Sequence, residues 1–227
     1  MGANAQTAVP VFTAGQVLTA VQQTQINTGI PVFATTVTRD AAFGGAGEKT
    51  LAEGQFAYIE ATNTTQYYDG AAWQSVGFTP TTAIFNETQA SGTEGGTFTA
   101  GSYVKRVLNT TVKNDIAGCS LASSVITLPA GTYQVFASAN AFAVDRQKLK
   151  LRNTTDSTDT QIGTSNQVQA ANVTLSTIVQ GLFTITASKN FEVQHRCETT
   201  RATDGLGRAT SFGDDEVYCT ITITKVA

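Results

Sequence analysis

The sequence is poor in the side chains that most often carry enzyme chemistry. Its 227 residues include one His, one Met and one Trp. Charged residues make up only 14% of the chain, against about 25% in an average globular protein, and the formal net charge is -3. A catalytic site is therefore disfavoured, although composition alone excludes no enzyme. The acidic balance argues against nucleic-acid binding.

Cysteine and long apolar runs are also scarce. Cys119, Cys197 and Cys219 are odd in number and form no CxxC pair, so we expect free thiols and neither a disulfide framework nor a zinc knuckle. No apolar run approaches the roughly 18 residues that a transmembrane helix needs. The first residues lack the basic and apolar regions of a secretory signal. We therefore expect neither membrane insertion nor signal-directed export.

What the sequence does contain points to β-structure. Thr is abundant and is joined by 20 Gly, and β-branched Thr suits a half-exposed pleated sheet. Beyond Thr82, apolar and polar residues alternate in many short segments separated by turns, which predicts a sandwich or jelly roll. In the segment KNFEVQHRC, the alternation places His195 and Cys197 on the inward face with Phe191 and Val193. The predicted fold class is all-β.

Residues 13 to 28 carry the clearest helical pattern. Thr13 and Gln16 match a capping box. The apolar side chains of the following turn share one face; they are Val17, Leu18 and Val21. A helix this short is marginal alone in water. We therefore expect it to dock on another surface, either the rest of the chain or a partner.

Residues 30 to 81 are predicted to form a small β appendage and a linker. The segments VFATTV, GQFAYIEATN and TQYYDGAAWQSVG predict three or four strands, with a hairpin at Asp69-Gly70. So few strands support only a mini-core, and we assign its aromatic residues as Phe56, Tyr58, Tyr67 and Trp73. A sugar-stacking cluster of Tyr67, Tyr68 and Trp73 is the alternative. The predicted domains are residues 1–29, 30–81 and 82–227.

Several segments resemble modules of tailed-phage virion proteins. GGTFTAGSYVKRVLNT, LPAGTYQVFASA, IVQGLFTITASKNFEVQH and the terminal EVYCTITITKV resemble their C1q/TNF-like jelly rolls. FTAGQVLTAVQQTQIN and EGQFAYIEATNTTQYYDGAAWQSV are similar to attachment modules of tail fibres and minor tail proteins. The resemblance implies a ten-stranded sandwich that forms a homotrimer about an axis lined by its inner sheet. It brings no catalytic residues, so it implies a structural protein and no enzyme.

The resemblance also implies a location and partners. The protein would be assembled in the host cytoplasm and would lie on the virion surface, bound to other tail or capsid proteins. A fibre or spike that meets the host is the first interpretation. A capsid decoration protein or head fibre that clamps capsomers is the alternative, and a polysaccharide-acting enzyme or a free lectin-like module is less favoured.

Three groups of candidate site residues follow. The first is a trimer interface opposite the apolar face of the last strand, with its strand neighbour: Tyr133, Tyr218, Thr220 and Thr222. The second is a virion-attachment helix: Val17, Leu18 and Val21. The third is a polar loop that either recognises host glycan or merely connects two strands: Arg201, Asp204 and Arg208.

Metal and cofactor sites are not expected. His195, Cys197 and Cys219 could offer three zinc ligands, but structural zinc usually takes four, so we interpret them as packed, unliganded side chains. The acidic loops around Asp156 and residues 214–216 lack the spacing of a calcium-binding EF-hand loop. Solvated charge is the simpler interpretation, with cation binding left open.

Overall fold

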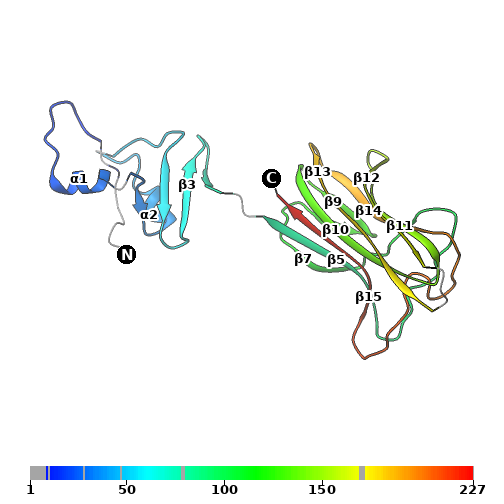
Figure 1. The fold of residues 1–227 in the computed structure, drawn as a ribbon. Helices are drawn as coiled ribbons and strands as arrows, with labels where there is room; N and C mark the ends of the chain where they lie inside the picture. The colour runs from blue at the N-terminus through cyan, green and yellow to red at the C-terminus, as the bar shows by residue number, and fades with distance from the viewer. Residues whose placement is uncertain are drawn as a thin grey trace. The chain divides into compact units, whose positions relative to one another are not determined.

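The computed structural model describes residues 9, 11–27, 29–46, 48–77, 80–168 and 172–226. The chain forms two compact units, residues 1–78 and 79–227, and each is described by itself (Figure 1).

The first unit is built on one small sheet. Its strands, in spatial order, are β1 (Val32–Phe33), β2 (Phe56–Ile59), β3 (Thr64–Tyr68) and β4 (Trp73–Ser75). β1 runs parallel to β2, and the other pairs are antiparallel. The expected sheet of three or four strands is therefore present. A short helix, α2 (Thr36–Asp40), follows β1. It begins there because Thr35 and Thr38 form a capping box that bonds the backbone N–H groups of its first turn.

The core of this unit differs from the predicted aromatic mini-core. Its buried side chains are Val9, Phe33, Ala42, Ala57 and Ile59. Trp73 packs against this cluster, as expected. Phe56 and Tyr67 instead lie on the exposed face and contact each other, with ring centroids 6.3 Å apart. Because side chains alternate along a strand, Ala57 and Ile59 take the inward positions of β2 and Phe56 cannot.

The Asp69-Gly70 turn has a different form from the predicted two-residue hairpin. Four residues, 69–72, separate β3 from β4. The Asp69 carboxylate accepts hydrogen bonds from the backbone N–H groups of Ala71 and Ala72, at 2.9 and 2.7 Å. These bonds hold the pKa of Asp69 below its usual value. Gly70 supplies the positive φ of +95° that the turn requires.

The N-terminal helix begins later than the sequence pattern predicts. α1 (Ala20–Asn27) is capped by Thr19, whose hydroxyl accepts from Gln22 N–H at 3.3 Å while Gln22 Oε1 accepts from Thr19 N–H at 2.9 Å. Thr13 and Gln16 form an isolated turn with similar bonds. The predicted start was therefore wrong. Val17 and Leu18 precede the helix and do not share a helical face with Val21.

The second unit contains two antiparallel sheets. Sheet I has the order β13 (Thr174–Ile185), β10 (Gly131–Phe142), β15 (Glu216–Lys225), β5 (Thr81–Gln89) and β7 (Thr110–Asn114). Sheet II has the order β12 (Thr158–Val168), β11 (Asp145–Asn153), β14 (Lys189–Cys197), β9 (Val125–Leu128) and β8 (Ser120–Ala122), with β6 (Val104–Lys105) also paired to β14. The chain crosses repeatedly between the sheets, as a jelly roll does (Figure 1). The predicted all-β jelly-roll sandwich is confirmed.

The core of the sandwich lies between the two sheets. Sheet I contributes alternate residues such as Phe85, Val135 and Ile221, and sheet II contributes residues such as Leu149 and Val193, all essentially inaccessible to solvent. Alternation along each strand therefore leaves one face of each sheet exposed. These two exposed faces are the surfaces on which function can be sought.

One edge of the sandwich is closed by side chains. Gln161 and Asn166 of β12 donate amide hydrogen bonds to backbone oxygens of β13, at 3.0 Å to Leu182 O and 2.9 Å to Ser176 O. Gly163 permits this close approach, because a Cβ atom there would lie 2.3 Å from Ile178 O. The free edge of β13 is thereby covered, which guards it against pairing with another strand.

Candidate interface and recognition surfaces

The exposed face of sheet I is free of charge along β13, β10, β15 and β5, among the residues that the structure describes. Its polar residues are Thr, Ser, Asn and Gln. Phe136 and Leu182 lie on it with 43% and 62% of their surface exposed. Phe136 is flanked across the strands by Gln180 and Thr222. Thr220 also lies on this face, as predicted.

Tyr133 and Tyr218 do not lie on this face, so the prediction that they point outward from the sandwich was wrong. Tyr133 points into the sandwich core and donates its hydroxyl to Pro129 O at 2.7 Å. Tyr218 is buried and donates to Thr93 O at 2.6 Å. The pairing of β15 with β5 shifts by one residue between Val217 and Cys219. This bulge reverses the alternation and exposes Val217 instead.

Burial changes the acidity of both phenols. Burial raises the pKa of Tyr133 to about 12, and the nearby Cys119 raises it further by a smaller amount. The pKa of Tyr218 is also raised to about 12, chiefly by burial and further by Glu216 and neighbouring carboxylates. Both tyrosines are therefore neutral, structural hydrogen-bond donors.

The predicted recognition loop is fixed to the sandwich. Arg201 forms two hydrogen bonds with the Asp204 carboxylate, at 2.7 and 3.1 Å. The guanidinium groups of Arg201 and Arg208 both lie over the ring of Phe142, at 5.1 and 4.8 Å from its centroid. The Arg201 backbone is bonded in both directions to Phe98. The side chains of Arg201 and Asp204 are thus engaged with each other, which leaves them less free to bind a ligand.

A buried ion pair anchors the same end of the sandwich. Arg106 Nε lies 2.6 Å from Glu87 Oε2, and both side chains are almost completely inaccessible. Arg106 also donates to three backbone oxygens, those of Asn140, Leu206 and Tyr218. One guanidinium therefore connects sheet I with the loop that carries Arg201 and Asp204.

His195 and the thiols are buried, as the alternation predicted. His195 Nε2 lies 2.9 Å from Gln147 Oε1, and Nδ1 has no hydrogen-bond partner among the described residues. Burial, reinforced by Arg106, lowers the pKa of His195 well below its usual value. Burial raises the pKa of Cys197 to about 11 and that of Cys219 to about 12. These groups are neutral at physiological pH and have no access to substrate.

The described residues contain no group of three or more His, Cys, Asp or Glu side chains placed to hold a metal ion. No helix among them is long and apolar enough to cross a membrane. Asp156, from one of the acidic loops, pairs with Lys189 at 2.6 Å.

The exposed face of sheet II is the opposite of that of sheet I, because it is densely charged. β11 places four cations on this face at every second position, namely Arg146, Lys148, Lys150 and Arg152. Arg196 of β14 and Lys105 of β6 join them. The alternation in DRQKLKLRN was visible in the sequence, but this basic face was not among the predicted sites.

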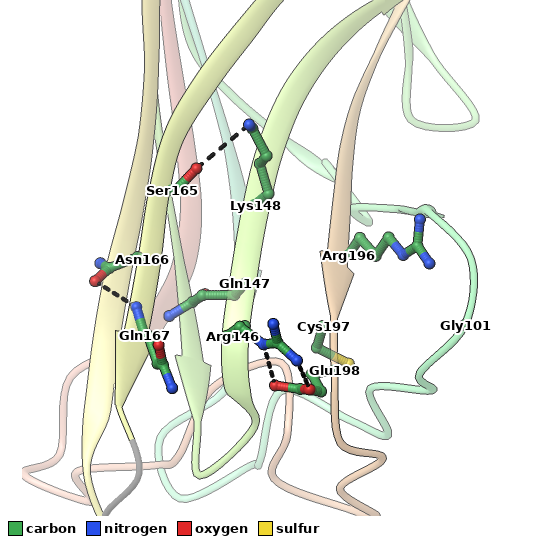
Figure 2. A pocket seen from close by; sticks show the side chains of 10 residues that line it. All are labelled: Gly101, Arg146, Gln147, Lys148, Ser165, Asn166, Gln167, Arg196, Cys197 and Glu198. Atoms are coloured by element: carbon green, nitrogen blue, oxygen red, sulfur yellow. Dashed lines mark hydrogen bonds and ion pairs between the residues drawn. The ribbon is translucent and has the colours of Figure 1, made fainter.

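A groove of about 630 Å³ lies at the end of this sheet where β11 begins and β14 ends. Figure 2 shows its lining, which comes from β11, β12, β14 and the segment around Gly101. It includes the polar side chains of Ser165, Asn166 and Gln167 beside the cations. Hydroxyl, amide and cationic groups together can bind a polar anionic ligand.

Comparison with known proteins shows likeness in structure only. No family model matches the chain, and no curated protein matches it. The globular domain of zebrafish complement 1qA protein is 13% identical and covers 65% of this chain and 96% of its own, with a TM-score of 0.40. Murine APRIL at pH 5.0 is 10% identical and covers 65% of this chain and 100% of its own, with a TM-score of 0.44. Eiger TNF from S. frugiperda is 14% identical and covers 66% of this chain and 94% of its own, with a TM-score of 0.42.

Proposed function

We propose that this chain is a homotrimeric structural protein whose sheet I lies at the threefold axis. The observation that carries the proposal is the exposed face of sheet I along β13, β10, β15 and β5, which bears no charge among the described residues while Phe136 and Leu182 remain accessible. Charged residues are depleted at the centres of protein interfaces and aromatic residues are enriched there. The charged face of sheet II is the surface left to solvent.

A second copy of the same chain is the partner that this face suits best. Its Thr, Ser, Asn and Gln side chains both donate and accept hydrogen bonds, so identical faces can satisfy each other around a symmetry axis. The resemblance to trimeric jelly-roll modules, carried by the segments around Leu128–Ala139 and the terminal strand, favours three copies.

The trimer is tested by reversing the apolar character of the face. We expect the unmodified protein to have three times the chain mass of 23.8 kDa in light scattering. Phe136→Lys combined with Leu182→Lys should give the single-chain mass, because the three copies would bring six cations together at the axis. Phe212→Lys is the matched control, since Phe212 is 87% exposed in a loop of the same unit. A single-chain mass for the unmodified protein at micromolar concentration would refute the proposal.

We further propose that the trimer is a virion component, with fibre or spike as the first assignment and capsid decoration or head fibre as the second. The support is the sequence resemblance of both halves of the chain to phage virion modules. The exposed jelly roll would serve assembly or host-surface binding, and the first unit would attach to a tail or capsid protein. Mass spectrometry of purified particles tests the location, and absence of the chain's peptides would contradict it.

The attachment segment is proposed to include Val17, Leu18 and Val21. Val17 and Val21 are 88% and 68% exposed, so their burial on a partner would release apolar surface from water. Val17→Asp with Val21→Asp should leave the trimer mass unchanged and reduce incorporation into particles. Val37→Asp, at an exposed valine of α2, is the control. Point changes are preferable to deleting residues 1–29, because Val9 belongs to the core of this unit.

Normal incorporation of the Val17/Val21 variant would show that the anchor lies elsewhere. Loss of incorporation by the Val37 variant as well would point to general damage of the first unit.

A further inference from the structure

Four of the six basic residues on the exposed face of sheet II are paired with carboxylates. Arg146 forms an ion pair with Glu198. Lys150 and Arg152 each lie 2.9 Å from Asp159 Oδ1. Lys105 Nζ lies 3.6 Å from Glu192 Oε1. Most of the basic residues on this face therefore have a carboxylate as partner.

Lys148 and Arg196 are the exception. Neither has a carboxylate partner among the described residues: Lys148 Nζ lies 3.3 Å from Ser165 Oγ, and the Arg196 guanidinium lies 6.0 Å from the ring centroid of Tyr103. The two residues are directly opposite each other in the register of β11 and β14. Like charges at such positions repel each other. An anion bound between them would convert this repulsion into attraction.

Lys148 and Arg196 lie at the groove described above. Both residues line it, together with Ser165, Asn166 and Gln167. Figure 2 shows Lys148 turned toward Ser165 and Arg196 turned toward the segment around Gly101. The two like-charged side chains are thus turned away from each other. Rotation about their side-chain bonds would bring both cations toward a bound group.

We propose that this groove binds an anionic group of an acidic polysaccharide, with Lys148 and Arg196 as the cationic contacts. The amide of Gln167 and the hydroxyl of Ser165, which line the groove beside these cations, would bond to sugar hydroxyl groups. The carboxylates on the rest of the face favour a ligand with widely spaced charges over the dense phosphates of a nucleic acid, which require many unpaired cations. The anion is a carboxylate or a phosphate, which share this chemistry.

The inference rests on the proposed function for its setting, an exposed module that meets a host surface. Its chemistry does not depend on the number of chains in the assembly. Light scattering tests the trimer and a binding assay tests the groove, so either can fail alone.

The test is a titration of four defined probes with the full chain, in which fluorescence anisotropy of the probe measures binding. The probes are labelled hyaluronan oligosaccharide, with one carboxylate per disaccharide, labelled phosphomannan with sparse phosphate groups, labelled neutral dextran, and a labelled single-stranded oligonucleotide. We expect one or both anionic glycans to bind, more weakly at high salt, and dextran not to bind. Binding of neither anionic glycan, or equal binding of the oligonucleotide, would overturn the proposal.

Substitutions locate the binding within the face. Lys148→Gln and Arg196→Gln should each weaken binding about tenfold, as expected for loss of one charge-assisted contact, and the double variant should abolish measurable binding. Arg152→Gln is the matched control, because Arg152 lies on the same strand and face but is paired with Asp159. An equal loss in the Arg152 variant would show that net charge alone attracts the glycan and would overturn the assignment of the groove.

Discussion

The buried Arg106–Glu87 pair gives the sharpest quantitative prediction about stability. In Arg106→Met the flexible apolar side chain replaces the guanidinium, and Glu87 keeps a carboxylate with almost no access to water. Breaking a buried ion pair from one side typically costs about 3 to 5 kcal/mol. Three backbone oxygens also lose a donor, those of Asn140, Leu206 and Tyr218. We therefore expect the free energy of unfolding to fall by about 3 to 5 kcal/mol.

A second substitution separates the buried charge from the lost hydrogen bonds. Arg106→Met combined with Glu87→Leu removes both charges and should recover a large part of the loss, because apolar replacements of a buried pair are often neutral. The unsatisfied oxygens should keep the double variant about 1 to 3 kcal/mol below the unmodified protein. Arg146→Met is the control, since it breaks the exposed pair with Glu198 and should change stability little.

The assay is urea unfolding of the full chain, followed by far-ultraviolet circular dichroism at one fixed protein concentration, because self-association makes stability depend on concentration. The single Trp, Trp73, lies in the first unit, so its fluorescence reports separately on residues 1–78 and should not change in Arg106→Met. Equal losses for Arg106→Met and Arg146→Met would refute the reasoning. So would a double variant no more stable than Arg106→Met.

Two further predictions concern the interior of the jelly roll. The pKa of His195 is lowered well below its usual value in the folded chain, so as pH falls below about 6.5 its imidazole binds a proton only in the unfolded state. The free energy of unfolding should therefore decline by up to about 1.4 kcal/mol per pH unit. In urea titrations between pH 6.5 and 5, His195→Gln should lack this pH dependence, and an unchanged dependence would contradict the assignment. Gly163→Ala should lower the free energy of unfolding by about 1 to 3 kcal/mol in the same assay, because the new Cβ atom would clash with the backbone oxygens of Ile178 and Leu149. Gly181→Ala is the control and should cost less, because its Cβ would meet the movable side-chain amide of Gln161. Equal losses for the two variants would contradict this reasoning.

The strands and the inward positions of the jelly roll could be predicted from the sequence, because the period of two is a local property of a half-buried strand. It placed His195 and Cys197 in the core correctly. It also assigned Thr220 and Thr222 to the exposed face of sheet I. The order of the strands was not predicted, because the alternation within a strand says nothing about which strands pair.

Other features depend on which strands become neighbours. Tyr218 is buried because the pairing of β15 with β5 contains a bulge, and no signal within the terminal strand marks that position. Phe56 is exposed because Ala57 and Ile59 take the inward positions of β2 in the small core of the first unit. Two Thr-x-x-Gln pairs, Thr13/Gln16 and Thr19/Gln22, form similar capping hydrogen bonds. Only the second pair is followed by helical turns, so the helix starts at Ala20.

The charges show the same division most clearly. The sequence alone predicts four cations on one face of β11, since their spacing is every second residue. Which of them are neutralised depends on the fold, because Glu198 and Asp159 come from other segments to pair with Arg146, Lys150 and Arg152, whereas Lys148 faces another cation, Arg196. Electrostatic energy depends on distance in space and not on separation along the chain. The unpaired Lys148 and Arg196, and the buried Arg106 beside Glu87, are therefore products of the fold.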